Sequence, residues 1–455
     1  MHHVSDQLSE RYPYRSGFRE EKDPHEVSRA YGGADIARFC WLLSPDEPLA
    51  DGARVDAMTA LADLLSSPEN KTKAIAAGIV PSCGRLLTFE SPRVKAAAAT
   101  VVAALAWDLD GLQALHADPT LLYNLNHLLF ESDTSCAEAA LQAFVNVTTA
   151  KAGIDIVLGR HYIPEKLVLM ASGDDPLSPR ATLLLFHAFA NLTKAAHGAE
   201  VCTTCHIVPA LLKVVRKPLH FELAVLRFAV LALWNLGTHN FGKIEAIGSN
   251  AVELSTKVLV GLQAGAIPCT DRPDLLRCLA GALMALATNE AAKPKLLHVA
   301  VQPLVACLYE PAAAANAAQA LNYMAEAPDG LLPIVTLLLD DTDMLMRVFG
   351  LRALPALSTL LAQQLRPARV LAALARLAPL EGAVAAMTQC LHLFEHLARL
   401  CVPNDDAPEL AAAAARVLQT VADDGPRAAM RVERAFAACA ITDAAVLASV
   451  IPRDK

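Results

Sequence analysis

The chain has 455 residues, more than one hydrophobic core usually serves. Hydrophobic residues make up 54% of the sequence and aromatic residues only 5%, so Ala and Leu supply much of the apolar content. Because these two residues favour helices, the composition predicts an all-helical protein built from several modules. The net charge of −8, without a long basic block, argues against binding to nucleic acid.

Neither export nor a membrane anchor is expected. The sequence has no uninterrupted apolar run of the roughly 18 to 20 residues that a transmembrane helix needs. Its first residues, MHHVSDQLSERYPYR, lack the apolar core of a signal peptide. Most of the 11 cysteines stand singly in apolar stretches, as Cys83, Cys136 and Cys307 do. They are interpreted as small core residues of a protein in a reducing compartment, and cytoplasmic localisation is expected.

Residues 1–34 are polar and charged, with Tyr12, Tyr14, Phe18 and Tyr31 interleaved. A segment of this kind cannot bury enough apolar surface to fold alone. We expect an extended arm whose aromatic side chains contact a partner protein.

One helical pattern then recurs along the chain: a small or apolar residue followed by apolar residues four and seven positions later. This spacing places an apolar stripe on one face of a helix. The seven anchor sets are Ala57/Leu61/Leu64, Ala98/Val102/Leu105, Ala140/Phe144/Val147, Leu185/Phe189/Leu192, Ala229/Leu233/Leu236, Leu279/Leu283/Leu286 and Ala317/Leu321/Met324. Their last members lie 41, 42, 45, 44, 50 and 38 residues apart, which indicates a repeat of about forty residues.

A proline recurs between these helices, at Pro81, Pro119, Pro164, Pro209 and Pro303. Proline suits the first turn of a helix, where its missing amide hydrogen would have no partner. Each repeat is therefore predicted to contain a short helix, a Pro-started helix and a longer third helix. This is the layout of an armadillo (ARM/HEAT-like) superhelical solenoid, in which each module covers its apolar face with its neighbours. Two-helix HEAT repeats are the nearest alternative.

The array is predicted to span residues 35–330 in about seven repeats. An insertion at residues 264–274 (AGAIPCTDRPD) accounts for the 50-residue interval. Residues 331–455 are interpreted as further degenerate helical repeats or a C-terminal cap.

Asn146, Asn191 and Asn235 occupy the same place in three successive third helices. An amide both donates and accepts hydrogen bonds, so such a ladder can hold the backbone of an extended peptide in the concave groove. His187 and Trp234 are predicted to line the groove beside them. The alternative is that the asparagines bond within their own helices.

Two short motifs suggest metal or haem chemistry. Cys202-Thr-Thr-Cys205-His206 matches the haem attachment pattern, and His392-Leu-Phe-Glu395-His396 matches an inverted zinc-protease motif. Both lie within the helical register, and no second C-x-x-C supplies more zinc ligands. Helix packing is the favoured interpretation of both, and no catalytic, cofactor or metal site is expected. Nucleotide-binding and hydrolase motifs are also absent from the sequence.

Residues 280–330 (AGALMALATNEAAKPKLLHVAVQPLVACLYEPAAAANAAQALNYMAEAPDG) resemble the armadillo-repeat radial spoke protein family of motile cilia, radial spoke head protein fourteen type. The similarity lies in the AGALM helix and in the closing AEAPDG segment. Near the N-terminus, Asp23-Pro24 and Ala30-Tyr31-Gly32 resemble the opening of that family. The family's usual chain ends soon after the closing segment, whereas this chain continues for some 125 residues more.

The resemblance implies a non-catalytic scaffold subunit of the radial spoke in the ciliary or flagellar axoneme. Its partners would be other radial spoke and axonemal proteins, close to doublet microtubules, with neither nucleic acid nor membrane. The alternative is a soluble cytoplasmic armadillo adaptor that binds an extended peptide of a partner protein.

Overall fold

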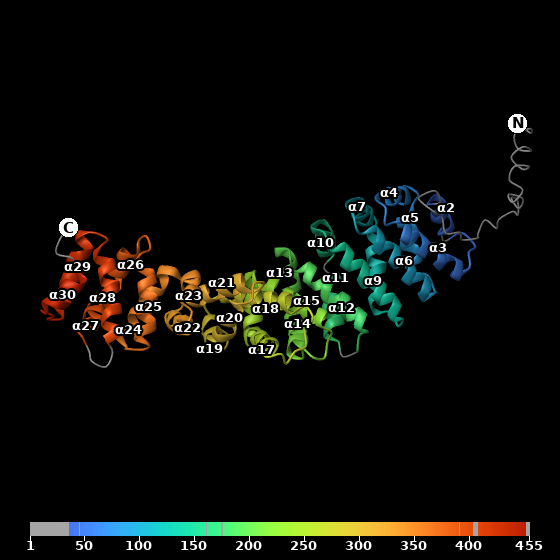
Figure 1. The fold of residues 1–455 in the computed structure, drawn as a ribbon. Coiled ribbons are helices and arrows are strands. Elements are labelled where there is room, and N and C mark those ends of the chain that lie inside the picture. Colours follow the sequence, from blue (N-terminus) through green and yellow to red (C-terminus); the bar gives the residue numbers. More distant parts are fainter. Residues whose placement is uncertain are drawn as a thin grey trace, which may run out of the picture. The chain divides into compact units, whose positions relative to one another are not determined.

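The computed structural model describes residues 36–44, 46–160, 162–173, 176–390, 392–403 and 408–451, which form helices and turns without any strand (Figure 1). Contacts divide the chain into two compact units, one ending at Ile207 and the other beginning at Val208. They are called the N-terminal and C-terminal units below. The predicted arm, with Tyr12, Tyr14, Phe18 and Tyr31, lies outside the described residues.

The N-terminal unit stacks three-helix repeats. It contains α2 (Ile36–Leu42), α3 (Asp51–Leu64), α4 (Pro68–Ala76), α5 (Ile79–Leu86), α6 (Pro92–Leu105), α7 (Leu109–Ala117), α8 (Pro119–His127) with a 3-10 turn (Leu128–Phe130), α9 (Thr134–Val147), α10 (Lys151–Leu158), α11 (Tyr162–Ser172), α12 (Pro179–Leu192) and α13 (Ala196–Thr204). The third helices α3, α6, α9 and α12 pack on one another in order. The first helices α4, α7 and α10 form a second row along one edge of this unit (Figure 1).

The C-terminal unit continues the same pattern. Its helices are α14 (Ile207–Arg216, which begins at the boundary), α15 (Leu223–Gly237), α16 (Asn240–Gly248), α17 (Ala251–Gln263), α18 (Arg272–Ala287), α19 (Lys293–Val299), α20 (Val301–Cys307), α21 (Ala314–Met324), α22 (Leu331–Leu338), α23 (Thr342–Val348), a 3-10 turn (Gly350–Ala353), α24 (Leu354–Ala362), α25 (Pro367–Leu377), α26 (Ala383–Gln389), α27 (Leu393–Leu400), α28 (Pro408–Ala422), α29 (Pro426–Ala438) and α30 (Ala444–Val450). The five prolines singled out in the sequence each lie in the first turn of a second helix, as predicted.

Beyond α21 the repeats change. The second helices α20, α22, α24 and α27 still pack in order, and so do the third helices α25 and α28. Two of these repeats, α22–α23 and α24–α25, have no first helix, because turns join each to the preceding helix. The irregular spacing of residues 331–377 therefore reflects two-helix repeats within the same stack.

The repeat anchors form the core. All of them are at most 2% exposed except Leu64, which is half-buried in a repeat that follows no earlier third helix in the described chain. Cys83, Cys136 and Cys307 are fully buried as predicted, and burial raises the pKa of Cys307 to about 11. In the described chain no single helix has both the length and the apolarity to cross a bilayer, although two bent helix pairs reach these limits jointly.

A glycine marks the junction between repeats. Gly111, Gly153, Gly198, Gly242 and Gly330 each lie six residues after the last anchor of a third helix. A Cβ atom built on Gly198 would lie 2.0 Å from the carbonyl oxygen of Leu192, and one on Gly153 would lie 1.8 Å from that of Val147. At these five junctions the chain turns into the next repeat so closely that an added Cβ atom would clash with the backbone, whereas the equivalent positions after Leu64 and Leu286 hold Asn70 and Ala292.

A buried lysine ties two repeats together in the C-terminal unit. The Lys293 side chain is only 3% exposed, and its Nζ donates to Glu290 at 2.6 Å and to Glu326 at 3.1 Å. Burial lowers the pKa of Lys293, but the hydrogen bonds to Glu290 and then to Glu326 outweigh this effect, and the net pKa is raised. Lys293 begins α19, whereas Glu326 follows α21, so one ammonium group joins successive repeats.

Candidate protein-binding surface

The third helices of the C-terminal unit form a surface built around Trp234. Its side chain on α15 is half-buried, and its ring lies against Gly281 of α18. A Cβ atom on Gly281 would come within 2.5 Å of the indole ring, so the glycine makes room for it. The sequence predicted Trp234 at a groove, and the structure places it half-exposed between successive third helices.

Charged groups surround this indole. The Arg277 guanidinium lies 5.5 Å from the centroid of the Trp234 ring, a cation–π arrangement. Arg277 also donates to Asp274 at 2.6 Å, and Arg227 of α15 donates to the same carboxylate at 3.2 Å. Burial raises the pKa of Asp274, but the hydrogen bonds from Arg277 and Arg227 outweigh it and hold that pKa below its ordinary value. This ionised carboxylate fixes both guanidinium groups on the surface.

Hydrogen bonds between repeats extend the same surface. Asn316 of α21 donates to the backbone oxygen of Arg277 at 3.0 Å. Asn235 follows Trp234 on α15 and is half-buried. An indole, two fixed guanidinium groups and amide side chains can contact the side chains and backbone of an extended peptide. We call Arg227, Trp234, Asn235, Asp274 and Arg277 the Trp234 cluster.

The predicted ladder residues of the N-terminal unit, Asn146 and Asn191, are buried and bond to neighbouring third helices. Asn146 is 4% exposed, and its amide donates to the carbonyl oxygen of Ala103 on α6 at 2.9 Å. Asn191 is 3% exposed, with its amide 3.4 Å from the carbonyl oxygen of Val145 on α9. Each amide thus spans two third helices, rather than bonding only within its own helix. Peptide binding by these two residues stays a prediction.

The acceptor oxygens of the two amides are also occupied. Gln142 donates to Asn146 Oδ1 at 2.9 Å, and Lys194 donates to Asn191 Oδ1 at 2.9 Å. His187, the other predicted groove residue of this unit, is half-buried on α12.

Asn146→Ala is expected to lower the free energy of unfolding by about 1 kcal/mol or somewhat more, because it leaves the buried Ala103 carbonyl without its partner. Chemical denaturation followed by circular dichroism measures this change. Asn240→Ala, at an exposed position in α16, serves as the control and should be close to neutral. Unchanged stability of Asn146→Ala would show that the bond contributes nothing.

The haem-like motif is part of the packing. Cys202 on α13 is fully buried, and burial raises its pKa to about 12. Cys205 caps the end of the same helix, and burial raises its pKa as well. Both thiols are neutral at ordinary pH, but only Cys202 belongs to the core, because Cys205 is half-buried.

The zinc-protease pattern does not form on one helix. His392 is the N-cap of α27 and has a left-handed backbone with φ of 58°, so it does not share the helical conformation that the motif requires of both histidines. Its Nδ1 lies 3.8 Å from Glu395. Within the described ranges, no three or more His, Cys, Asp or Glu side chains are grouped so as to hold a metal ion.

Comparison with known proteins bears on the fold. No family model matches this sequence, and no curated protein matches it. Among solved structures, an engineered protein from a structural genomics consortium aligns with a TM-score of 0.59, covering 91% of this chain and 97% of its own, at 22% identity. The fold is an armadillo solenoid.

Two further solved structures align less well. A computationally designed armadillo repeat protein for modular peptide recognition covers 55% of this chain and 99% of its own, with 18% identity and a TM-score of 0.47. A designed armadillo repeat protein in complex with the peptide (KR)4 covers 56% of this chain and 100% of its own, with 20% identity and a TM-score of 0.47.

No sequence pattern pointed to Arg227, Asp274, Arg277 or Gly281 as surface residues. The two arginines gave no signal, because arginine is common on the exposed face of any helix. Gly281 within a helix was the available signal, since a glycine there usually has a packing reason.

Proposed function

We propose that this solenoid is a non-catalytic scaffold that binds a segment of another protein at the Trp234 cluster. The observation that carries the proposal is the half-exposed indole of Trp234, held between Gly281 and the Arg277 guanidinium. Tryptophan and arginine are the residues most often found at energetic centres of protein interfaces. A fixed aromatic–arginine surface therefore suits protein recognition.

In its more specific form, the proposal is that the chain is a structural subunit of the ciliary radial spoke, located in the axoneme and docking other spoke and axonemal proteins. The support is the resemblance of residues 280–330 and of the N-terminal Asp23–Gly32 segment. Within the closing AEAPDG segment, Glu326 pairs with Lys293, and Gly330 passes the Met324 carbonyl oxygen, which a Cβ atom would approach to 2.0 Å. Both residues thus stabilise a junction between repeats. The resemblance in this segment therefore concerns the packing of the repeat and not a binding surface.

A tagged copy expressed in a ciliated cell tests the location. We expect the protein to stay with axonemes after detergent and salt extraction, and to copurify with spoke proteins. A diffuse cytoplasmic signal and no axonemal partners would overturn the radial spoke assignment.

The same preparation tests the surface. Trp234→Ala is expected to weaken partner binding about tenfold or more, because central tryptophans contribute about 2 kcal/mol or more to interfaces. Trp107→Ala is the matched control, since Trp107 follows α6 in the N-terminal unit and is 63% exposed. Equal partner recovery with both variants would contradict binding at the Trp234 cluster.

A soluble cytoplasmic adaptor is the second candidate, and the same cluster favours it, because an indole beside Asn235 suits one extended peptide. A pulldown dominated by one linear-motif ligand, lost in Trp234→Ala, would support the adaptor over the spoke subunit.

A further inference from the structure

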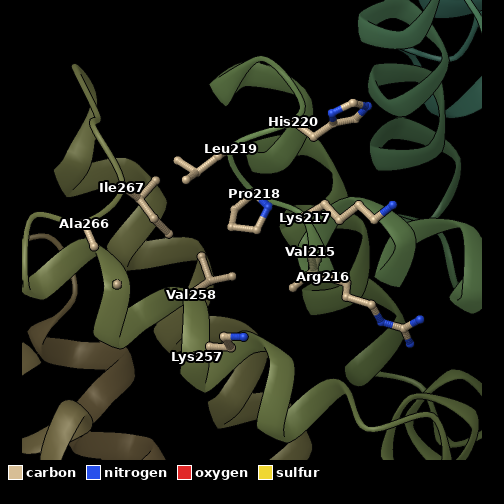
Figure 2. A pocket seen from close by; sticks show the side chains of 11 residues that line it. Val215, Arg216, Lys217, Pro218, Leu219, His220, Lys257, Val258, Ala266 and Ile267 are labelled. Carbon is tan, nitrogen blue, oxygen red and sulfur yellow. The ribbon is translucent and has the colours of Figure 1, made fainter.

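A pocket of about 540 Å³ opens in the C-terminal unit, and its lining includes no residue of the Trp234 cluster (Figure 2). It lies between the loop after α14 and the second helix of the next repeat, α17. The insertion that follows α17 forms one wall of it. Its volume is in the range of roughly 300 to 1,000 Å³ that is typical of ligand-binding sites.

One wall of the pocket is fixed by the insertion. Gly265 ends α17 with a left-handed φ of +71°, and the amide of Ala266 donates back to the carbonyl oxygen of Gly261 at 2.8 Å. The chain then folds over α17, so that a Cβ atom on Gly261 would lie 3.0 Å from Ile267 Cδ1. The insertion that the sequence indicated is thus a closed turn that holds Ile267 in place.

Apolar side chains line the interior. Pro218 and Leu219 come from the loop after α14, and they face Val258 and Ile267 across a common space (Figure 2). Leu219 is 71% exposed, whereas Ile267 is 9% exposed. An exposed leucine alone is ordinary, but here it extends an already hollowed apolar surface.

The rim of the pocket is basic. Arg216, Lys217, His220 and Lys257 are among its lining residues, and no Asp or Glu is. All four are exposed, and no salt bridge joins Arg216, Lys217 or Lys257 to another described residue. Arg216 and Lys217 also lie at the carboxyl end of α14, where positive charges interact favourably with the helix dipole. Lys257, within α17, has no such role.

We propose that this pocket binds a short segment of a partner protein in which one large apolar side chain is flanked by acidic residues. The apolar side chain would fill the space between Leu219, Val258 and Ile267. The acidic residues would pair with Lys257 and with Arg216 and Lys217, whose charged ends extend away from the pocket interior (Figure 2). A concave site suits an inserted side chain, whereas a membrane surface would need a protruding apolar face.

Selection from a random-peptide display library tests this proposal with the full chain. We expect the enriched peptides to carry Leu, Phe or Trp between Asp or Glu residues. A fluorescent peptide of that pattern should bind Lys257→Glu and Leu219→Ser at least about fivefold more weakly than the unmodified chain.

Three controls separate the outcomes. Lys73→Glu makes the same charge change at an exposed position on α4 and should not alter binding. Trp234→Ala should leave this binding intact, so its failure and that of the proposed function are distinguishable. Circular dichroism checks that each variant is folded.

The proposal would be overturned if no acidic–apolar peptides are enriched, or if the pocket variants bind them as Lys73→Glu does. Leu219-dependent capture by phosphatidylserine vesicles without peptide binding would also overturn it, in favour of a lipid surface.

Discussion

Gly198→Ala is expected to destabilise the N-terminal unit by about 1 to 2 kcal/mol, although alanine is the better helix former. The added methyl group would lie 2.0 Å from the Leu192 carbonyl oxygen and 3.0 Å from its carbon. Overpacking of this kind costs about 1 to 3 kcal/mol, and a backbone neighbour cannot rotate away as a side chain can. The gain in helix propensity, about 1 kcal/mol, offsets only part of the strain.

Gly52→Ala provides the matched control for this substitution. Gly52 lies near the start of α3, and a Cβ atom there would have no neighbour within 4 Å. We expect Gly52→Ala to be neutral or slightly stabilising. Thermal denaturation and hydrogen exchange of α12 and α13 measure both variants. Equal melting of Gly198→Ala and Gly52→Ala would show that the junction relaxes without cost.

Lys293→Met is expected to destabilise the C-terminal unit by about 2 kcal/mol. Methionine keeps the apolar contacts of the lysine stem but loses the two charge-assisted hydrogen bonds, each partner being a carboxylate. Glu290 and Glu326 are 83% and 49% exposed, so water can solvate them once the lysine is gone. This limits the loss below that of a charge left buried without a partner. Lys73→Met, at an exposed site, is the control and should be neutral.

The pH dependence of this variant follows from the raised pKa of Lys293. A lysine whose pKa is higher in the folded than in the unfolded chain stabilises the fold below its ordinary value of 10.5. That contribution disappears as the pH rises above 10.5 through the folded value. The stability difference between the unmodified chain and Lys293→Met should therefore be constant between about pH 7 and 9 and shrink above 10.5. Denaturation at a series of pH values measures it, and a gap that widens at high pH would contradict the assigned pairing.

The sequence predicted the parts of this fold that depend on local spacing. Apolar residues at i, i+4 and i+7 recur in the third helices, and a proline recurs in the first turn of most second helices, although α17 and α27 have none. The repeat period, the order of the helices and the buried face of each third helix could therefore be predicted. Trp234 was predicted beside the asparagines of a groove, and the structure places it half-buried on α15, while its binding role stays a prediction. The repeat-junction glycines keep the same period as the anchors, and their spacing could have identified them.

Contacts between repeats could not be read in the same way. Arg227 meets Asp274 across 47 residues, and Asn146 meets Ala103 across 43. Such pairs depend on how far each repeat turns against the next, which no local pattern specifies. The missing first helices beyond α21 were visible only as irregular spacing, because a deleted helix leaves no residues to detect.

The two-helix repeats α22–α23 and α24–α25 should affect where the solenoid unfolds under force or heat. In a one-dimensional stack, stability is a sum of terms within modules and between neighbours, so cooperativity is interrupted wherever both terms are small. A module of two helices has less interior and less contact area than one of three. We therefore expect residues 331–377 to open, on pulling or heating, before the three-helix modules of the C-terminal unit do.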